Sequence, residues 1–133
     1  MTELVGGCFC GAVRYLSTAP VIDAGYCHCR ICQGTCGAPA VVWISVPAAG
    51  FAFTRGNPSA FESSPRGIRY FCPTCGTQVT FRRPDSDEVD INSLSLDDPE
   101  AVLPEYHVWI NTQLSWFKLQ DSLPRYEDDG PDR

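Results

Sequence analysis

The chain has 133 residues, of which 44% are hydrophobic and 20% charged, a composition typical of one soluble globular domain. No apolar run approaches the roughly 18 to 20 residues that a membrane-spanning helix requires, so the sequence argues against a membrane partner or span. The formal net charge of −6 disfavours a nucleic-acid partner, because surfaces that bind nucleic acids usually carry a basic patch.

Short segments rich in β-branched and aromatic residues recur along the chain, separated by clusters of Gly, Pro, Asn and Ser. They predict strands over 12–18, 38–46, 51–55, 67–71, 77–83 and 88–94. No segment has the periodicity of a long amphipathic helix. The chain is therefore expected to be mostly β and to form a single domain over residues 1–133.

The C-terminal part has a different character. Residues 104–126 are expected to form a strand followed by a turn-rich segment, in which Trp109, Trp116 and Phe117 close the core; a ligand-binding role for the tryptophans is the alternative. The acidic end, residues 127–133, is expected to be a flexible, solvated tail.

Eight cysteines are the most informative feature of the composition. The start, MTELVGGCFC, has neither the positive region nor the apolar stretch of a secretory signal, which predicts a cytoplasmic protein. In a reducing compartment, metal binding or thiol chemistry explains so many cysteines better than disulfides do.

Two close cysteine pairs lie far apart in the sequence, namely Cys8 with Cys10 and Cys72 with Cys75. Four thiolates around one zinc ion leave no open position, so such a site would be structural, and it would close a loop of about 60 residues. Gly76, which follows the second pair, relaxes the backbone of the turn. Spacing alone equally permits the second pair to share a metal with cysteines of residues 27–32, and four buried free thiols are the simpler alternative.

A second group occurs in CHCRIC, where Cys27, Cys29 and Cys32 can hold zinc and leave its fourth position open for Lewis-acid chemistry. His28 lies between two of these cysteines, so its side chain is expected to point away and to act from the outer shell or in proton transfer; a solvent-facing His28 is the alternative. Three roles are open for Cys36: a fourth ligand that closes the site, a free nucleophile, or a small buried residue.

The ordered series of motifs resembles the glutathione-dependent formaldehyde-activating enzyme family, which includes centromere protein V. The similarity covers nearly the whole chain, through GGCFCGAVRY, CHCRIC, CGAPA, FTRGNPSAFESSPRGIRYFCPTCGTQVTF, SLDDPE, HVWI and DSLPRY. It implies an Mss4-like β-tent of antiparallel sheets with zinc-binding loops. It also implies two zinc ions, a structural one at Cys8, Cys10, Cys72 and Cys75 and a more exchangeable one at Cys27, Cys29 and Cys32.

The resemblance further implies a carbon–sulfur lyase-type activity that joins glutathione, or another small thiol, to formaldehyde as S-(hydroxymethyl)glutathione. We expect the thiol to take the open zinc position, ionise and attack the aldehyde, with backbone amides of QGTCG (33–37) stabilising the oxygen. Candidate partners for the glutathione carboxylates, each also interpretable as a surface charge, are Arg30, Arg66, Arg69, Arg82 and Arg83.

Two other functions stay open at this point. Cys36 departs from the family loop, which more often has a small hydroxyl residue there, and a closed second site would favour a non-catalytic, zinc-stabilised module that binds another protein. A thiol redox enzyme, such as a methionine sulfoxide reductase of similar architecture, would instead use Cys36 or a neighbouring cysteine as a reactive thiol. The sequence does not indicate an oligomeric state.

Overall fold

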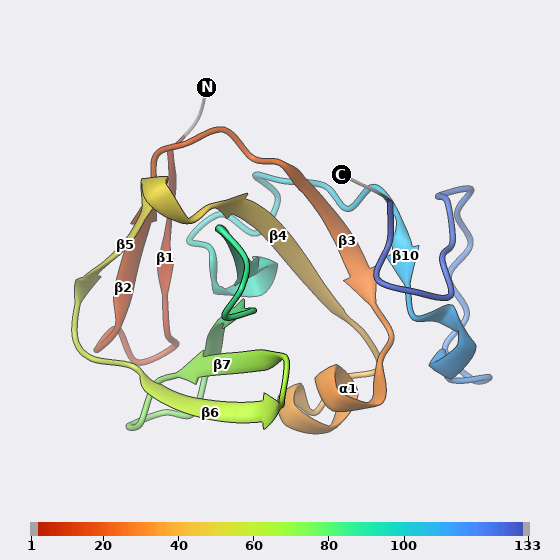
Figure 1. The fold of residues 1–133 in the computed structure, drawn as a ribbon, viewed down its shortest axis with the longest axis horizontal. Helices are drawn as coiled ribbons and strands as arrows, with labels where there is room; N and C mark the ends of the chain where they lie inside the picture. Colours follow the sequence, from red (N-terminus) through yellow and green to blue (C-terminus); the bar gives the residue numbers. More distant parts are fainter. Residues whose placement is uncertain (1–2, 132–133) are drawn as a thin grey trace.

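Two β-sheets form the framework of the computed structural model, which describes residues 3–131 (Figure 1). The smaller sheet has the order β1–β2–β5, and the larger has the order β10–β3–β4–β9–β8–β7–β6. Neighbouring strands are antiparallel, except that β10 runs parallel to β3. The strands are β1 (Leu4–Gly7), β2 (Arg14–Ser17), β3 (Asp23–Cys27), β4 (Val41–Pro47), β5 (Phe51–Arg55), β6 (Ser59–Ser64), β7 (Gly67–Phe71), β8 (Gln78–Arg82), β9 (Glu88–Asn92) and β10 (His107–Val108).

Helices are few and short. The α-helix α1 spans Arg30–Cys36, and the 3₁₀ helices are η1 (Ala48–Gly50), η2 (Ser93–Ser95) and η3 (Ile110–Thr112). Over residues 3–131, no helix has the length and apolarity needed to cross a bilayer. The mostly β, antiparallel β-tent expected from the sequence is therefore confirmed.

All six predicted strands are present, and those over 51–55 and 67–71 have the predicted bounds. The strands that the sequence did not predict, which include β1, β3 and β6, lack a clear alternation of apolar and polar residues. β6 is polar and largely exposed, whereas β3 contains Gly25 in its centre. A Cβ at Gly25 would overlap the ring of Tyr106, so glycine is required there despite its low strand propensity.

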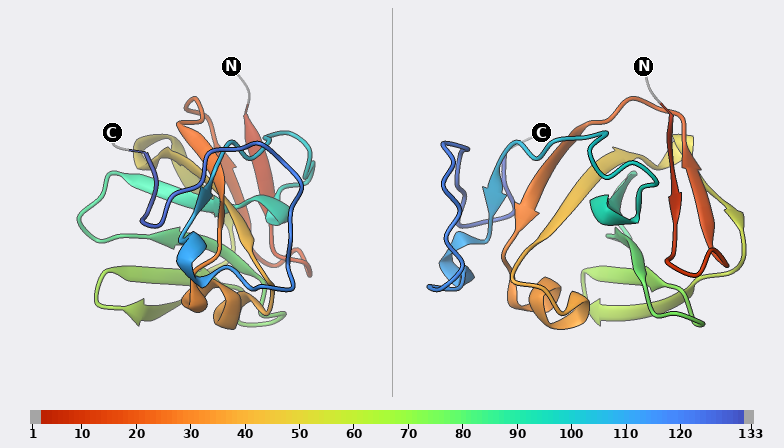
Figure 2. Two further views of the ribbon diagram at one scale, coloured as in Figure 1. Left: turned by 90° about the vertical axis from the view of Figure 1, so that its right-hand side faces the viewer. Right: turned by 180° about the vertical axis from the view of Figure 1, so that it is seen from behind.

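The main core fills the space between the small sheet and the long strands β3 and β4, which Figure 2 shows from behind. Side chains alternate between the two faces of β4, so this one strand contributes to two apolar clusters. Ile44 and Val46 are fully buried in this core, whereas Val41 and Trp43 belong to a second apolar cluster. Tyr15 of β2 is also fully buried, and its hydroxyl lies 2.7 Å from Ser95 Oγ.

The C-terminal segment corrects two expectations. Trp116 is 70% exposed and Trp109 39% exposed, so they do not close the core; residues 113–124 form no helix or strand that would turn them inward. Residues 128–130 of the predicted acidic tail pack against the fold. The Asp128 carbonyl accepts a hydrogen bond from the Trp109 amide, and Gly130 is buried. Figure 2 shows this segment beside β10. Residues 132–133 of the predicted tail lie outside the described residues.

Two glycines provide a matched test of this packing. A Cβ at Gly6 would overlap the Ser95 carbonyl oxygen and the Tyr15 side chain, whereas a Cβ at Gly34, inside α1, meets nothing within 4 Å. Gly6→Ala should lower the free energy of unfolding by about 1 to 3 kcal/mol through overpacking. Gly34→Ala should raise it by up to about 1 kcal/mol through helix propensity. Urea unfolding of both variants measures the difference, and equal stability of the two would contradict the packing.

Candidate active site

Four thiols come together where a turn of the small sheet meets a turn of the large sheet. Cys8 and Cys10 lie between β1 and β2, and Cys72 and Cys75 lie between β7 and β8; their Sγ atoms are all within 4.8 Å of one another. The Cys8–Cys10 and Cys10–Cys72 sulfur distances are 3.6 and 3.8 Å. Sulfurs held about 2.3 Å from a tetrahedral metal stand roughly 3.8 Å apart, so these thiols fit one metal ion.

The two turns use the same backbone device. Each pair is followed by a glycine in the left-handed region, Gly11 at φ 82° and Gly76 at φ 81°. The Gly11 amide donates to the Cys8 carbonyl and the Gly76 amide to the Cys72 carbonyl. Further amides point at sulfur, since the Val13 amide lies 3.2 Å from Cys8 Sγ and the Cys75 amide 3.4 Å from Cys72 Sγ. Such donors stabilise the negative charge of metal-binding thiolates.

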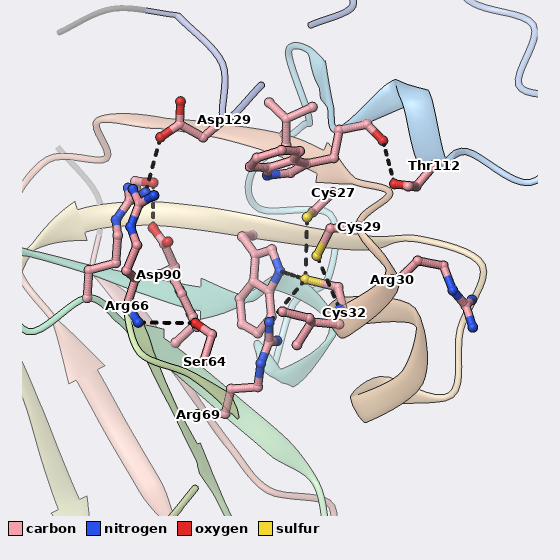
Figure 3. A pocket seen from close by; sticks show the side chains of 18 of the residues that line it. Cys27, Cys29, Arg30, Cys32, Ser64, Arg66, Arg69, Asp90, Thr112 and Asp129 are labelled. Carbon is pink, nitrogen blue, oxygen red and sulfur yellow. Dashed lines mark hydrogen bonds and ion pairs between the residues drawn. The ribbon is translucent and has the colours of Figure 1, made fainter. Parts of the chain in front are cut away.

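The second group consists of Cys27 at the end of β3, Cys29 and Cys32, whose Sγ atoms also lie within 4.8 Å of one another (Figure 3). Cys29 caps α1, because its sulfur accepts a hydrogen bond from the Cys32 amide at 3.2 Å. Cys27 and Cys32 are buried, with their sulfurs 3.3 Å apart, and Cys29 is half-buried. The short helix thus brings its first turn back onto the end of the strand.

These three thiols hold one negative charge easily and further charge poorly. Hydrogen bonds from Cys27 and Cys32 lower the pKa of Cys29 to about 2. The hydrogen bond with Cys29, followed by that with Cys32 and by burial, raises the pKa of Cys27 far above its usual range. Full ionisation of the group therefore requires a cation, and thiolate donors suit soft or borderline metals. The donor set fits a metal ion that has three protein sulfurs.

A cavity of about 450 Å³ lies beside this three-thiol cluster. The three cysteines form part of its lining, and side chains from β4, β8 and the C-terminal segment form apolar walls, among them Trp43, Phe81, Val108 and Trp109. The volume is in the range, roughly 300 to 1,000 Å³, that is usual for small-molecule sites. The four-thiol cluster has no part in this lining.

The arginines proposed for ligand carboxylates do not all reach the cavity. Arg66 is exposed, and Arg83 is paired with Asp129 at 3.3 Å; both line it. Arg30 also lines it, although it donates to Gln33 Oε1 and its side chain points away from the sulfurs in Figure 3. Arg82 does not line this cavity but a different hollow, with residues of β5 and β7, so the structure does not support a role for it at this ligand site.

Arg69 is not a surface charge, because it is only 4% exposed. Its Nη2 lies 3.5 Å from Cys32 Sγ, and its Nε donates to Ser63 Oγ at 2.9 Å. Its guanidinium carbon lies 4.9 Å from the ring centre of Phe81 and 5.9 Å from that of Trp43. The Trp43 Nε1–H also points at Cys32 Sγ, at 3.4 Å. Two donors, one of them charged, therefore stabilise the sulfur of Cys32.

His28 is fully buried, so the solvent-facing alternative is wrong. Its Nε2 lies 2.9 Å from Nδ1 of His107, whose Nε2 lies 3.0 Å from Asp121 Oδ2. The Asp121 carboxylate can only accept a hydrogen bond. With both rings neutral, His107 therefore donates from Nε2 to Asp121, and His28 donates from Nε2 to Nδ1 of His107. Burial is the largest cause that lowers the pKa of His28, to about 4, and this keeps His28 neutral at pH 7.

The backbone of His28 is held just as firmly. Its amide donates to the Val108 carbonyl, and its carbonyl accepts from Gln33 Nε2 and from Thr112 Oγ1, both at 2.9 Å. His28 is not among the residues that line the cavity, so its side chain lies behind the cysteines. Sequence reasoning gave no role to His107 or Asp121, although both lie in the quoted HVWI and DSLPRY motifs.

Cys36 lies at the far end of α1 and is not among the grouped thiols. Its thiol donates to Gln78 Oε1 at 3.2 Å, and burial raises its pKa, so it stays protonated. The expectation that backbone amides of residues 33–37 stabilise the reacting oxygen is not supported, because these amides are already used within the helix. They belong to α1 and its cap: the Gln33 amide donates to the Cys29 carbonyl and the Gly37 amide to the Gln33 carbonyl.

The position of Cys36 predicts how metal content responds to substitution. Cys36→Ser should leave the number of metal ions per chain unchanged, because the side chain bonds to Gln78 and not to the cluster. Cys32→Ser should lose one ion and retain the ion at the four-thiol cluster. Elemental analysis of the purified variants measures both values. Loss of an ion from Cys36→Ser would show that Cys36 is a ligand.

The chain is similar to known proteins in sequence and in fold. The family model described as glutathione-dependent formaldehyde-activating enzyme matches residues 3–112. A crystal structure of a Rhodobacter sphaeroides protein is similar at a TM-score of 0.58 and 25% sequence identity, over 77% of this chain and 92% of that chain. No curated protein is significantly similar to the chain. Because the family match extends over most of the sequence, the chain belongs to the glutathione-dependent formaldehyde-activating enzyme family.

Proposed function

We propose that both cysteine clusters bind zinc, with different roles. Zinc favours tetrahedral thiolate coordination, and four protein sulfurs at Cys8, Cys10, Cys72 and Cys75 would leave it no open position. That ion would be structural and would tie the turn of the small sheet to the turn of the large one. The cluster of Cys27, Cys29 and Cys32 would leave one position for an exogenous ligand and would exchange its ion more easily.

The proposed reaction is the addition of the glutathione thiol to formaldehyde, giving S-(hydroxymethyl)glutathione, a carbon–sulfur lyase-type activity. The sulfur–carbon bond forms, the carbonyl π pair moves to oxygen, and that oxygen takes the proton that the thiol has given up. A zinc ion at the three-thiol cluster would supply positive charge that favours the thiolate form of the incoming thiol. Membership of the family supports glutathione as the thiol.

The cavity beside the three-thiol cluster is the observation that carries this proposal. It is large enough for a small peptide thiol, and Cys29, the most exposed member of the cluster, lines it. Arg66 and Arg83 stand at the same cavity and can receive carboxylates, while Asp129 beside Arg83 can receive an amine. Glutathione carries both kinds of group, so its ends find complementary charges while its sulfur meets the cysteines.

A non-catalytic, zinc-stabilised interaction module is the competing function. It would require a closed second site, with Cys36 as the natural fourth ligand. The bond from Cys36 to Gln78 and the cavity beside the three-thiol cluster favour the enzyme. The eight free thiols are compatible with a reducing compartment, and we propose the cytoplasm.

An activity assay tests the proposed reaction. Purified protein of measured zinc content should accelerate the glutathione-dependent loss of formaldehyde above the spontaneous rate, followed by NMR. Cys29→Ser should remove the acceleration, because it deletes one of three metal-binding sulfurs. It should leave the fold intact, because serine is also a good helix N-cap and can accept the same hydrogen bond from the Cys32 amide.

Cys36→Ser is the matched control, since it makes the same chemical change in a thiol outside the cluster, and it should retain the rate. Circular dichroism and thermal unfolding check that both variants are folded. A zinc-loaded wild-type protein that leaves the spontaneous rate unchanged would refute the proposed reaction.

A further inference from the structure

We propose that Arg69 is a catalytic residue that donates a hydrogen bond from Nη1 to the aldehyde oxygen as the sulfur–carbon bond forms. This inference rests on the proposed function, because it names the group that contacts the reacting oxygen in that site. It replaces the earlier expectation that Arg69 binds a carboxylate of glutathione.

The first observation is an unused donor. The Nε and Nη2 groups of Arg69 are engaged by Ser63 and Cys32, but among the described residues no partner exists for Nη1, which is buried. Leaving a charged donor without a partner in a buried place is costly, and such groups usually have an unexplained ligand or a functional reason. Arg69 is among the residues that line the cavity, so a molecule bound there lies beside its guanidinium group.

The second observation is where this donor lies. Nη2 of the same planar guanidinium contacts Cys32 Sγ, so Nη1 is held two covalent bonds away from an atom that touches the sulfur cluster. In a hydroxymethyl thioether the oxygen is likewise two bonds from sulfur. A thiol that reacts beside the cysteines therefore brings its new oxygen close to Nη1, whereas the carboxylates of glutathione lie many bonds farther from its sulfur.

The third observation is rigidity. The guanidinium packs against the rings of both Phe81 and Trp43, and Arg69 is 4% exposed, so it cannot follow a mobile carboxylate at the cavity mouth. A fixed donor in a water-poor place is suited to charge that develops during reaction, because no reorganisation is needed when the oxygen becomes negative. Guanidinium also keeps its proton at any ordinary pH, so it stabilises the oxygen by hydrogen bonding and leaves proton transfer to another donor.

Kinetics of Arg69→Lys and Arg69→Met test the inference. Loss of this donor should lower kcat by about 100-fold, the usual effect of removing an oxyanion donor. The loss should be equal for glutathione and for 2-mercaptoethanol, because the aldehyde oxygen is common to both reactions. Arg82→Lys, a matched change at an arginine on the neighbouring strand that faces another hollow, should change kcat less than twofold.

Metal content separates contact with the oxygen from support of Cys32. If Arg69 acts on the reacting oxygen, both Arg69 variants should retain the wild-type number of metal ions while kcat falls. Equal loss of metal and of activity would overturn the inference, because Arg69 would then only stabilise the Cys32 thiolate. Retention of wild-type kcat by Arg69→Met would overturn it as well.

Formate binding gives a test that does not depend on turnover. Formate is a one-carbon anion that carries its negative oxygen in a stable form. Isothermal titration calorimetry should show binding to the metal-loaded wild type and at least tenfold weaker binding to Arg69→Met, with Arg82→Lys like the wild type. Equal affinity in all three proteins would overturn the role of Arg69. If the wild type binds formate through Arg69 but does not accelerate the reaction, the proposed reaction is refuted, whereas the role of Arg69 as a donor to an anion is retained.

Discussion

The convergence of four thiols from two hairpin turns is the constraint on which the rest of this structure depends. Cys10 and Cys72 are 62 residues apart, yet their sulfurs lie 3.8 Å from each other, and they connect the small sheet to the strands that carry Arg69 and Phe81. A metal ion bound there would close this long loop and contribute directly to folding. It would also fix β7 and β8 relative to the core, and these strands supply one wall of the cavity.

The three-thiol cluster is organised differently, because its support lies behind the sulfurs. The side chain of His28 leads to His107 and Asp121, and the His28 peptide is tied to β10, η3 and α1. In an extended segment neighbouring side chains point to opposite sides, so anchoring the histidine holds the cysteines on either side of it toward the cavity. The C-terminal segment thus contributes to the site through positioning as well as through the wall residue Trp109, although Trp116 is largely exposed.

Sequence reasoning found the parts of the site that have local signals. CxC, CxxC and CHCRIC are short-range patterns set by metal geometry, and the apolar strands follow from alternation. The remainder depends on long-range packing. Nothing in the sequence distinguishes Arg69 from other arginines of an alternating strand, because Trp43 and Phe81 pack against it only in the fold. His107 likewise reaches His28 only because β10 pairs with β3. The helix α1 was missed because it has seven residues and is specified by the Cys29 cap and by Gly37 rather than by periodicity.

The central claim is that one cluster is closed and the other accepts an outside sulfur. Cobalt(II) placed in the three-thiol cluster of protein that holds zinc in the four-thiol cluster tests it most directly, since thiolate-to-cobalt charge-transfer absorbance reports the number of bound sulfurs. The account predicts three protein sulfurs at first, and an increase in this absorbance when glutathione is added, in the wild type and in Cys36→Ser alike. A four-sulfur spectrum before glutathione is added, unchanged afterwards, would contradict it.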